Sequence, residues 1–270
     1  MSRLTMHLES MSSNSNSHSI ASRFLPHEEA TIDLSAPHRL FIPEHYESGY
    51  DYPLVVWLHS DASCEHELDN IMMALSSRNY VAIAPRAQQK CRGIGNRFRW
   101  GLSATESAVA EDLVWDSIQS VSSGLSIDTN KIFLAGFGAG GTLAQWIGLK
   151  YASQIAGVVS LSGCFPKTPR PLSNWKQSRR LPVLFGQRQG STLCSDDEFI
   201  RAVRISHRSG LGYRFFQMRS DEDFCSEAND LDSAMLEASN RFMMGIVTNT
   251  ELSLLPEEIC DSECIEFGFN

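Results

Sequence analysis

The chain alternates short, mostly apolar runs, of which residues 54–58 are apolar throughout, with segments in which apolar residues recur at helical spacing. A strand that is apolar at every position is typical of a parallel sheet covered by helices on both faces. Buried parallel strands are joined by right-handed crossovers, so this order predicts an α/β fold, a three-layer α/β/α sandwich with a mostly parallel central sheet. The runs that carry this prediction are residues 54–58, 80–84, 131–135 and 157–161.

Amphipathic segments between these runs predict the helices. Ser63 is expected to cap a helix over residues 68–75, and Ser103 with Glu106 forms a capping box for the next one. The helix after that box is expected to bury the stripe Val109, Leu113, Ser117 and Val121. Further helices are expected at residues 140–151, 195–206 and 231–246, and further strands at residues 40–42, 181–185 and 213–217.

The two ends of the chain differ in composition from its middle. Residues 1–22 are polar and low in complexity and are expected to be disordered. Residues 23–247 are expected to form one α/β domain, since a chain of 270 residues can bury a sizeable core. Residues 248–270 are expected to form an acidic C-terminal tail.

Charge and cysteine usage narrow the classes of partner. A formal net charge of -9 argues against a nucleic-acid or anionic-membrane surface, since both need clustered Lys and Arg. No apolar stretch is long enough for a membrane span, and the first residues lack the apolar core of a secretory signal. Seven scattered cysteines predict reduced thiols and a cytoplasmic location. No metal or cofactor is predicted, because Cys260 and Cys264 have no accompanying histidine or second cysteine pair.

Residues 131–144 have the strand, sharp turn and helix of a nucleophile elbow. The flanking glycines of the Gly-x-Ser-x-Gly motif are present as Gly136 and Gly140, but position 138 is glycine and carries no attacking oxygen. The rival interpretation is a dinucleotide-binding turn. That motif normally follows the first strand and has an acidic residue about 20 positions on, whereas this one follows a middle strand.

In this order the segments resemble the α/β-hydrolase family that includes carboxylesterases, phospholipase-type esterases and polyhydroxyalkanoate-depolymerase-like proteins. The resemblance covers about residues 30–247 and implies an α/β-hydrolase domain. It is carried by the elbow and by residues 54–59, 79–86, 157–163 and 181–186, which are similar to the family's strands around its catalytic loops.

The resemblance also identifies where the catalytic groups should be. The oxyanion loop corresponds to His59, Ser60 and Asp61, in which serine replaces a glycine and Asp61 adds a carboxylate that opposes a developing oxyanion. The second oxyanion donor would be the backbone N–H of Ala139. The cavity over Gly138 is the expected ligand pocket.

The acid and the base of the family's triad are also replaced. The aspartate position corresponds to Ser191, and the nearby Asp196 and Asp197 are expected to cap a helix instead. The histidine position corresponds to Glu222, and no histidine follows His207, which is expected on a helix surface. With Gly138 these are three losses, and loss of one triad member already removes several powers of ten in rate.

Three functions therefore remain open. In the first, the chain is a homologue of carboxylic ester hydrolases that has no serine-esterase activity and binds a small molecule or a protein partner. Alternatively, it is an active hydrolase with a displaced site, for which Ser160, Ser162, Cys164 and Cys225 are the candidate nucleophiles. The third is an interaction role through its terminal segments. The sequence identifies neither a ligand nor a protein partner.

Overall fold

The structure is a computed structural model that describes residues 37–93, 95–167, 172, 174–219 and 231–250, and the strand at 264–267. The expected disordered segment 1–22, Glu222, Cys225 and Cys260 lie outside the described residues. Within the described part of the chain, no helix is long and apolar enough to cross a membrane.

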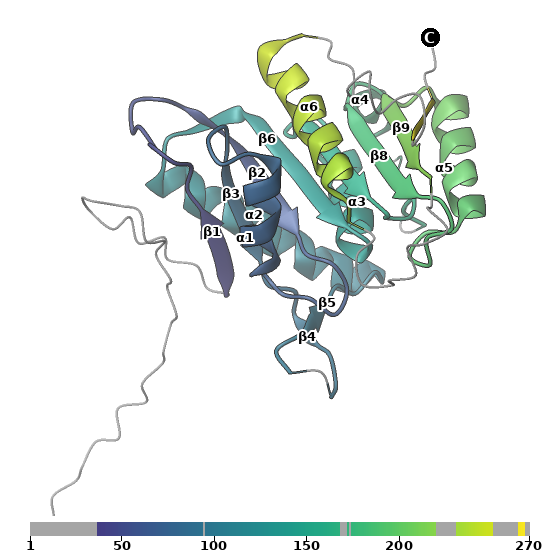
Figure 1. The fold of residues 1–270 in the computed structure, drawn as a ribbon, viewed down its shortest axis with the longest axis horizontal. Coiled ribbons are helices and arrows are strands. Elements are labelled where there is room, and N and C mark those ends of the chain that lie inside the picture. The colour runs from purple at the N-terminus through teal and green to yellow at the C-terminus, as the bar shows by residue number, and fades with distance from the viewer. Residues whose placement is uncertain are drawn as a thin grey trace, which may run out of the picture.

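Eight strands form one sheet in the order β1-β3-β2-β6-β7-β8-β9-β10 (Figure 1). The strands β3, β2, β6, β7, β8 and β9 run parallel, and β1 and β10 add antiparallel edges. This confirms the predicted mostly parallel sheet. Its strands are β1 (His38–Phe41), β2 (Tyr52–Leu58), β3 (Val81–Pro85), β6 (Ile127–Phe137), β7 (Gly157–Leu161), β8 (Val183–Arg188), β9 (Tyr213–Met218) and β10 (Cys264–Phe267).

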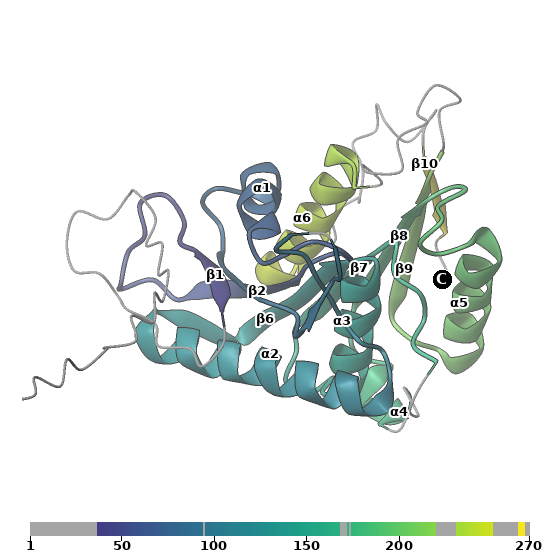
Figure 2. The same ribbon diagram turned by 90° about the horizontal axis from the view of Figure 1, so that it is seen from below.

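Helices cover both faces of the sheet. The helices α1 and α6 pack on one face, and α2, α3 and α5 pack on the other (Figure 2). The predicted three-layer sandwich is therefore confirmed. The helices are α1 (Glu67–Leu75), α2 (Ala104–Gly124), α3 (Ala139–Lys150), α4 (Trp175–Ser178), α5 (Asp196–Ser209) and α6 (Ser233–Thr248).

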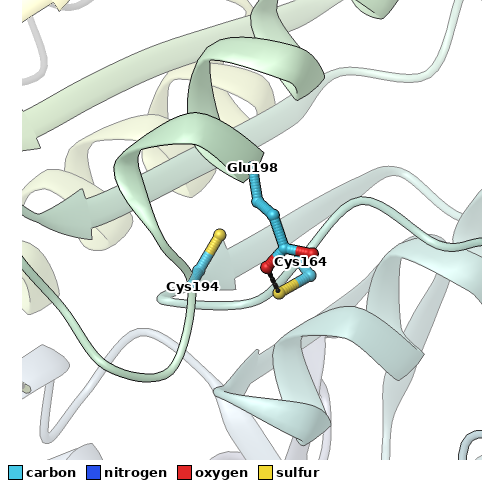
Figure 3. A group of neighbouring side chains, drawn as sticks. All are labelled: Cys164, Cys194 and Glu198. Atoms are coloured by element: carbon cyan, nitrogen blue, oxygen red, sulfur yellow. Dashed lines mark hydrogen bonds between the residues drawn. The ribbon is translucent and has the colours of Figure 1, made fainter.

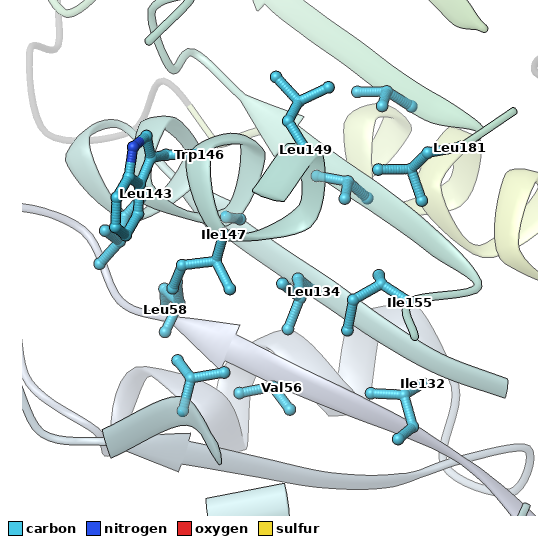
Figure 4. Close-up of a cluster of buried hydrophobic side chains, with 14 of the residues drawn as sticks. Val56, Leu58, Ile132, Leu134, Leu143, Trp146, Ile147, Leu149, Ile155 and Leu181 are labelled. Atoms are coloured by element: carbon cyan, nitrogen blue, oxygen red, sulfur yellow. The ribbon is translucent and has the colours of Figure 1, made fainter. Parts of the chain in front are cut away.

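The strand β2 shows why its run is apolar at every position. Leu54, Val56 and Leu58 face the helices α2 and α3, whereas Val55 and Trp57 face α1 and α6. Figure 4 shows the first of these layers, in which side chains of α3 lie over the strands of the sheet. A strand in the middle of a two-sided sheet has no solvent-facing position, so no polar residue interrupts the run.

Some sequence predictions are wrong in detail. The N-cap of α1 is His66, not Ser63, because the Ser63 carbonyl accepts from the N–H of Phe98 and so pairs with another loop. The buried stripe of α2 runs along Ala110, Val114, Ser117, Ile118 and Val121, whereas Val109 and Leu113 are half-buried beside it.

Four short elements were not predicted from the sequence. Three are polar and short, namely the hairpin of β4 (Gln89–Lys90) with β5 (Phe98–Arg99) and the single turn α4. The fourth is β10, which lies within the segment expected to be an acidic tail and pairs antiparallel with β9. Residues 251–263 and 268–270 of that segment lie outside the described residues.

The helix α3 approaches β2 so closely that only glycine fits at the contact. A Cβ on Gly140 would overlap the carbonyl oxygen of Leu58, and a Cβ on Gly136 would lie 2.7 Å from the same oxygen. Backbone atoms cannot move aside as side-chain ends can. The two glycines therefore set how near the start of α3 lies to the sheet.

We expect Gly140→Ala to lower the free energy of unfolding by about 3 kcal/mol, because the new methyl group overlaps backbone. Gly138→Ala is the matched control. Its Cβ would meet only Leu193, at 3.6 Å, so the loss should be about 1–2 kcal/mol from the positive φ alone. Urea denaturation of both variants measures the difference, and equal losses would contradict the close-approach explanation.

Candidate site over Gly138

The predicted elbow is a strand–turn–helix centred on Gly138. The strand β6 ends at Phe137, α3 begins at Ala139, and Gly138 between them has φ 57° and ψ -122°. Its N–H donates to the carbonyl of Leu161, at 2.9 Å, which ties the turn to the end of β7. A left-handed φ strains residues that carry a Cβ. Glycine adopts this turn without strain, and the space above it is open.

A cavity of about 360 Å³ lies over this turn, a size typical of small-molecule sites. Gly138 and Ala139 line it, and its wall includes the large apolar side chains Leu143, Trp146 and Phe165. The charged lining residues are Asp61, Lys167 and Glu198. Because Lys167 and Glu198 form an ion pair of 2.5 Å, Asp61 is the charge left without a countercharge in the lining.

The carboxylate of Asp61 lies near the backbone N–H of Ala139, which favours its ionised form. The protein around this carboxylate displaces water and so raises its pKa, although the side chain remains open to the cavity. The charges of His59 and Arg99 and the Ala139 N–H oppose that rise. Because Ala139 begins α3, its N–H also carries the positive end of the helix dipole, which favours an anion there. The donor expected to stabilise an oxyanion thus has a side-chain carboxylate beside it.

The neighbouring residue Ser60 is held in a similar way. Its N–H lies 3.2 Å from both carboxylate oxygens of Glu67, and its hydroxyl donates to Glu67 Oε2 at 2.6 Å. The indole N–H of Trp57 donates to Glu67 Oε1, at 2.9 Å. The segment that follows β2 is therefore fixed by a carboxylate on α1, and Ser60 lies outside the cavity lining.

His59 has a structural environment. It is fully buried; its Nδ1 lies 2.8 Å from the Ser60 carbonyl, and its Nε2 accepts from the Ala87 N–H at 3.0 Å. Both contacts are satisfied by a neutral ring that carries its proton on Nδ1. Burial lowers the pKa of His59, against smaller opposing effects of Ser60 and of nearby carboxylates. A ring with both nitrogens engaged is not placed to take a proton from a residue at position 138.

The lowered pKa of His59 makes stability depend on pH. In the unfolded chain the imidazole of His59 binds a proton below about pH 6.5, whereas in the folded chain it stays neutral to a lower pH. The contribution of His59 to the free energy of unfolding is therefore full above pH 6.5 and declines as the pH falls from 6.5 toward the lowered pKa of the folded state. We expect His59→Asn to flatten this decline in urea denaturation between pH 7.5 and 5. His207→Gln, at an exposed position, should keep the native slope. An unchanged slope in His59→Asn would show that other groups cause the decline.

The position expected for the catalytic acid is occupied by Ser191, which carries no carboxylate. Ser191 is buried, and its hydroxyl oxygen accepts from the Leu193 N–H at 3.2 Å. Asp196 accepts from the side-chain amides of Gln187, at 2.8 Å, and Gln217, at 3.0 Å. Asp196 thus joins the ends of β8 and β9, whereas the expected capping of α5 is done by Ser195, which accepts from the Glu198 N–H.

The structure brings Asp61, Gly138 and Ala139 together around one cavity, whereas His59, Ser60 and Ser191 lie outside its lining. The base position Glu222 lies outside the described residues. His207 is exposed on α5, as expected. Among the candidate replacement nucleophiles in the described part, Cys164 lines the cavity, while Ser160 and Ser162 are buried beneath it.

Sequence reasoning missed Lys167, Leu193 and Glu198 as parts of the site. They lie on the loops after β7 and β8 and at the start of α5, far from the elbow in sequence. Each is an ordinary surface-type residue in an ordinary context, so the sequence carried no signal for them.

Comparison with known proteins agrees with the fold. Residues 105–200 match the model of the phospholipase/carboxylesterase family. No curated protein sequence shows significant similarity to the chain.

Solved esterases share the architecture at low sequence identity. Esterase PE8 is 17% identical with a TM-score of 0.60, over 80% of this chain and 100% of that one. SOBER1 of Arabidopsis thaliana is 16% identical with a TM-score of 0.59, over 73% of this chain and 99% of that one. The carboxylesterase of Bacillus cereus is 13% identical with a TM-score of 0.57, over 77% and 93%.

The sheet order, the elbow and these structural likenesses define an α/β-hydrolase-fold protein. Within that class, the matching family model confirms the resemblance to phospholipase/carboxylesterase-type proteins.

Proposed function

We propose that this chain is a non-hydrolytic α/β-hydrolase-fold protein that binds a small, largely apolar molecule in the cavity over Gly138. The observation that carries the proposal is that the carboxylate of Asp61 lines the cavity together with Gly138 and Ala139, near the N–H of Ala139. In an active esterase the N–H at position 139 would stabilise the oxyanion of ester cleavage. Here it directly follows Gly138, which has no side chain.

Electrostatics oppose ester hydrolysis at this position. An oxyanion that develops near Ala139 would meet the negative charge of Asp61. The sequence has no histidine beyond His207, and His59 uses both ring nitrogens in buried contacts. A nucleophile at position 138 would therefore lack both a base and an oxyanion site.

The same charge selects the class of ligand. Among the lining residues, the Lys167–Glu198 pair is neutral overall, so Asp61 gives the lining itself a net negative charge, with Arg99 nearby but outside the lining. The apolar walls suit a hydrocarbon or aromatic body. A neutral or cationic ligand with a donor group facing Asp61 fits this lining, whereas a carboxylate, the product of ester hydrolysis, would be repelled.

We expect the native chain to hydrolyse p-nitrophenyl butyrate no faster than buffer and to resist a serine-directed fluorophosphonate. Gly138→Ser should also remain inactive, although there is room for its Cβ, because none of the described residues is placed to take up the serine proton. The expected readouts are a flat progress curve and an unlabelled intact mass.

Labelling of the native chain at a single site, together with saturable turnover, would overturn the proposal. It would favour the alternative of an active hydrolase with a displaced site, for which Cys164 on the cavity wall is the leading nucleophile. Full activity of Gly138→Ser would likewise show that a base exists outside the described residues.

Ligand selection can be tested with two probes of similar shape and opposite charge, phenethylamine and 3-phenylpropanoate. By calorimetry we expect the amine to bind more tightly, by on the order of tenfold. Asp61→Asn keeps the size and should remove most of this preference, while Asp112→Asn, on the exposed side of α2, should leave it unchanged. Equal binding of both probes to the native chain would contradict the assigned ligand class.

A cytoplasmic location remains part of the proposal. It is supported by Cys64, Cys91, Cys164 and Cys194, which are all free thiols in the described residues. An interaction role for the terminal segments 1–22 and 248–270 is the remaining alternative, and truncation of those segments would test it.

A further inference from the structure

Three ligand-type side chains meet at the wall of the cavity (Figure 3). Cys164 follows β7, Cys194 precedes α5, and Glu198 lies in the first turn of α5. Their two sulfur atoms and a carboxylate oxygen all lie within 4.8 Å of one another. The sequence separates Cys164 from the other two by about thirty positions, so only the fold brings them together.

The spacing of these atoms suits a tetrahedral metal ion. Zinc binds thiolate sulfur at about 2.3 Å and carboxylate oxygen at about 2.0–2.2 Å, so neighbouring ligand atoms lie roughly 3.5–3.8 Å apart. Cys164 Sγ lies 3.2 Å from Glu198 Oε2, and the remaining separations are below 4.8 Å. Small side-chain rotations therefore complete the ligand triangle without any movement of the backbone.

The surroundings also favour ligation. Cys194 is buried, while Cys164 and Glu198 reach the cavity, so an ion can enter and keep one open position toward it. The neighbouring Cys194 thiol lowers the pKa of Cys164, against the opposing effects of burial and of Glu198, and contact with Cys164 together with burial raises the pKa of Cys194.

One contact of the free site competes with a metal ion. Lys167 Nζ lies 2.5 Å from Glu198 Oε1, and this ion pair lowers the pKa of Glu198. The lysine side chain is 63% exposed, so it can turn into solvent when an ion takes over the carboxylate. Removal of the Lys167 cation should therefore raise the affinity of the site for Zn²⁺, an effect not expected of a cluster with a purely structural role.

We propose that Cys164, Cys194 and Glu198 form a zinc-binding site on the wall of the cavity, with a fourth position left for water or a ligand atom. Binding releases two thiol protons and exchanges the Lys167–Glu198 ion pair for a Zn²⁺–carboxylate bond. Affinity therefore rises with pH. The site stands apart from the proposed function, since zinc binding needs no ligand in the cavity and no hydrolysis.

The first test titrates the reduced, chelator-treated full chain with Zn²⁺ in competition with a chromophoric chelator. We expect one Zn²⁺ per chain, bound at least about tenfold more weakly by Cys164→Ser and by Cys194→Ser. The matched controls Cys91→Ser and Cys260→Ser/Cys264→Ser should bind as the native chain does. Loss of binding in the Cys260/Cys264 variant, with both cluster variants unaffected, would place the zinc elsewhere and overturn the proposal.

The second test uses Lys167→Gln, which removes the competing cation. We expect it to bind Zn²⁺ several-fold more tightly, whereas Glu198→Gln should bind more weakly. If the cysteine variants do not fold, Co²⁺ added to the native chain gives the answer. Thiolate-to-cobalt charge-transfer bands with a tetrahedral visible spectrum support the site. Their absence, or a Cys164–Cys194 disulfide that forms without metal uptake, overturns it.

Discussion

The close backbone contact between the start of α3 and the end of β2 is the constraint on which the rest of the site depends. Gly136 and Gly140 have no room for a Cβ beside the Leu58 carbonyl, so α3 begins directly against the sheet. That placement points the first N–H groups of the helix at the carboxyl edge of the parallel strands. In open α/β sheets this edge is where ligands bind. The cavity over Gly138 is the local consequence.

The same geometry can serve two opposite purposes. An elbow presents a nucleophile and a backbone donor to a carbonyl substrate. Here the carboxylate of Asp61 lies near the donor N–H of Ala139, and the nucleophile position has no side chain. The frame of a hydrolase thus holds a negatively charged, mostly apolar pocket. Its charge is set by one side chain of the loop after β2, which is itself fixed by the bonds from Ser60 to Glu67.

Loops from separate strands supply the rest of the cavity wall. Because β7 and β8 are adjacent and parallel, the loops that follow them leave the sheet at the same edge. Cys164 after β7 and Cys194 after β8 therefore meet, although neither has a partner nearby in sequence. Periodicity reports which residues share a face of one element. It does not report which loops converge, so this cluster could not be predicted from the pattern.

The sequence by itself determined the three layers and the alternation of helices and strands along the chain. It did so because a strand buried on both faces, such as residues 54–58, admits no polar residue. It also determined the elbow and the residue types at positions 61, 138 and 139, since these are local. Only the tertiary structure decided that Asp61 and Ala139 line one cavity, that both nitrogens of His59 are buried in contacts, and that Ser63 pairs with Phe98 instead of capping α1. Those outcomes depend on distances between separate loops, and distances across a fold follow from packing, which local sequence patterns do not encode.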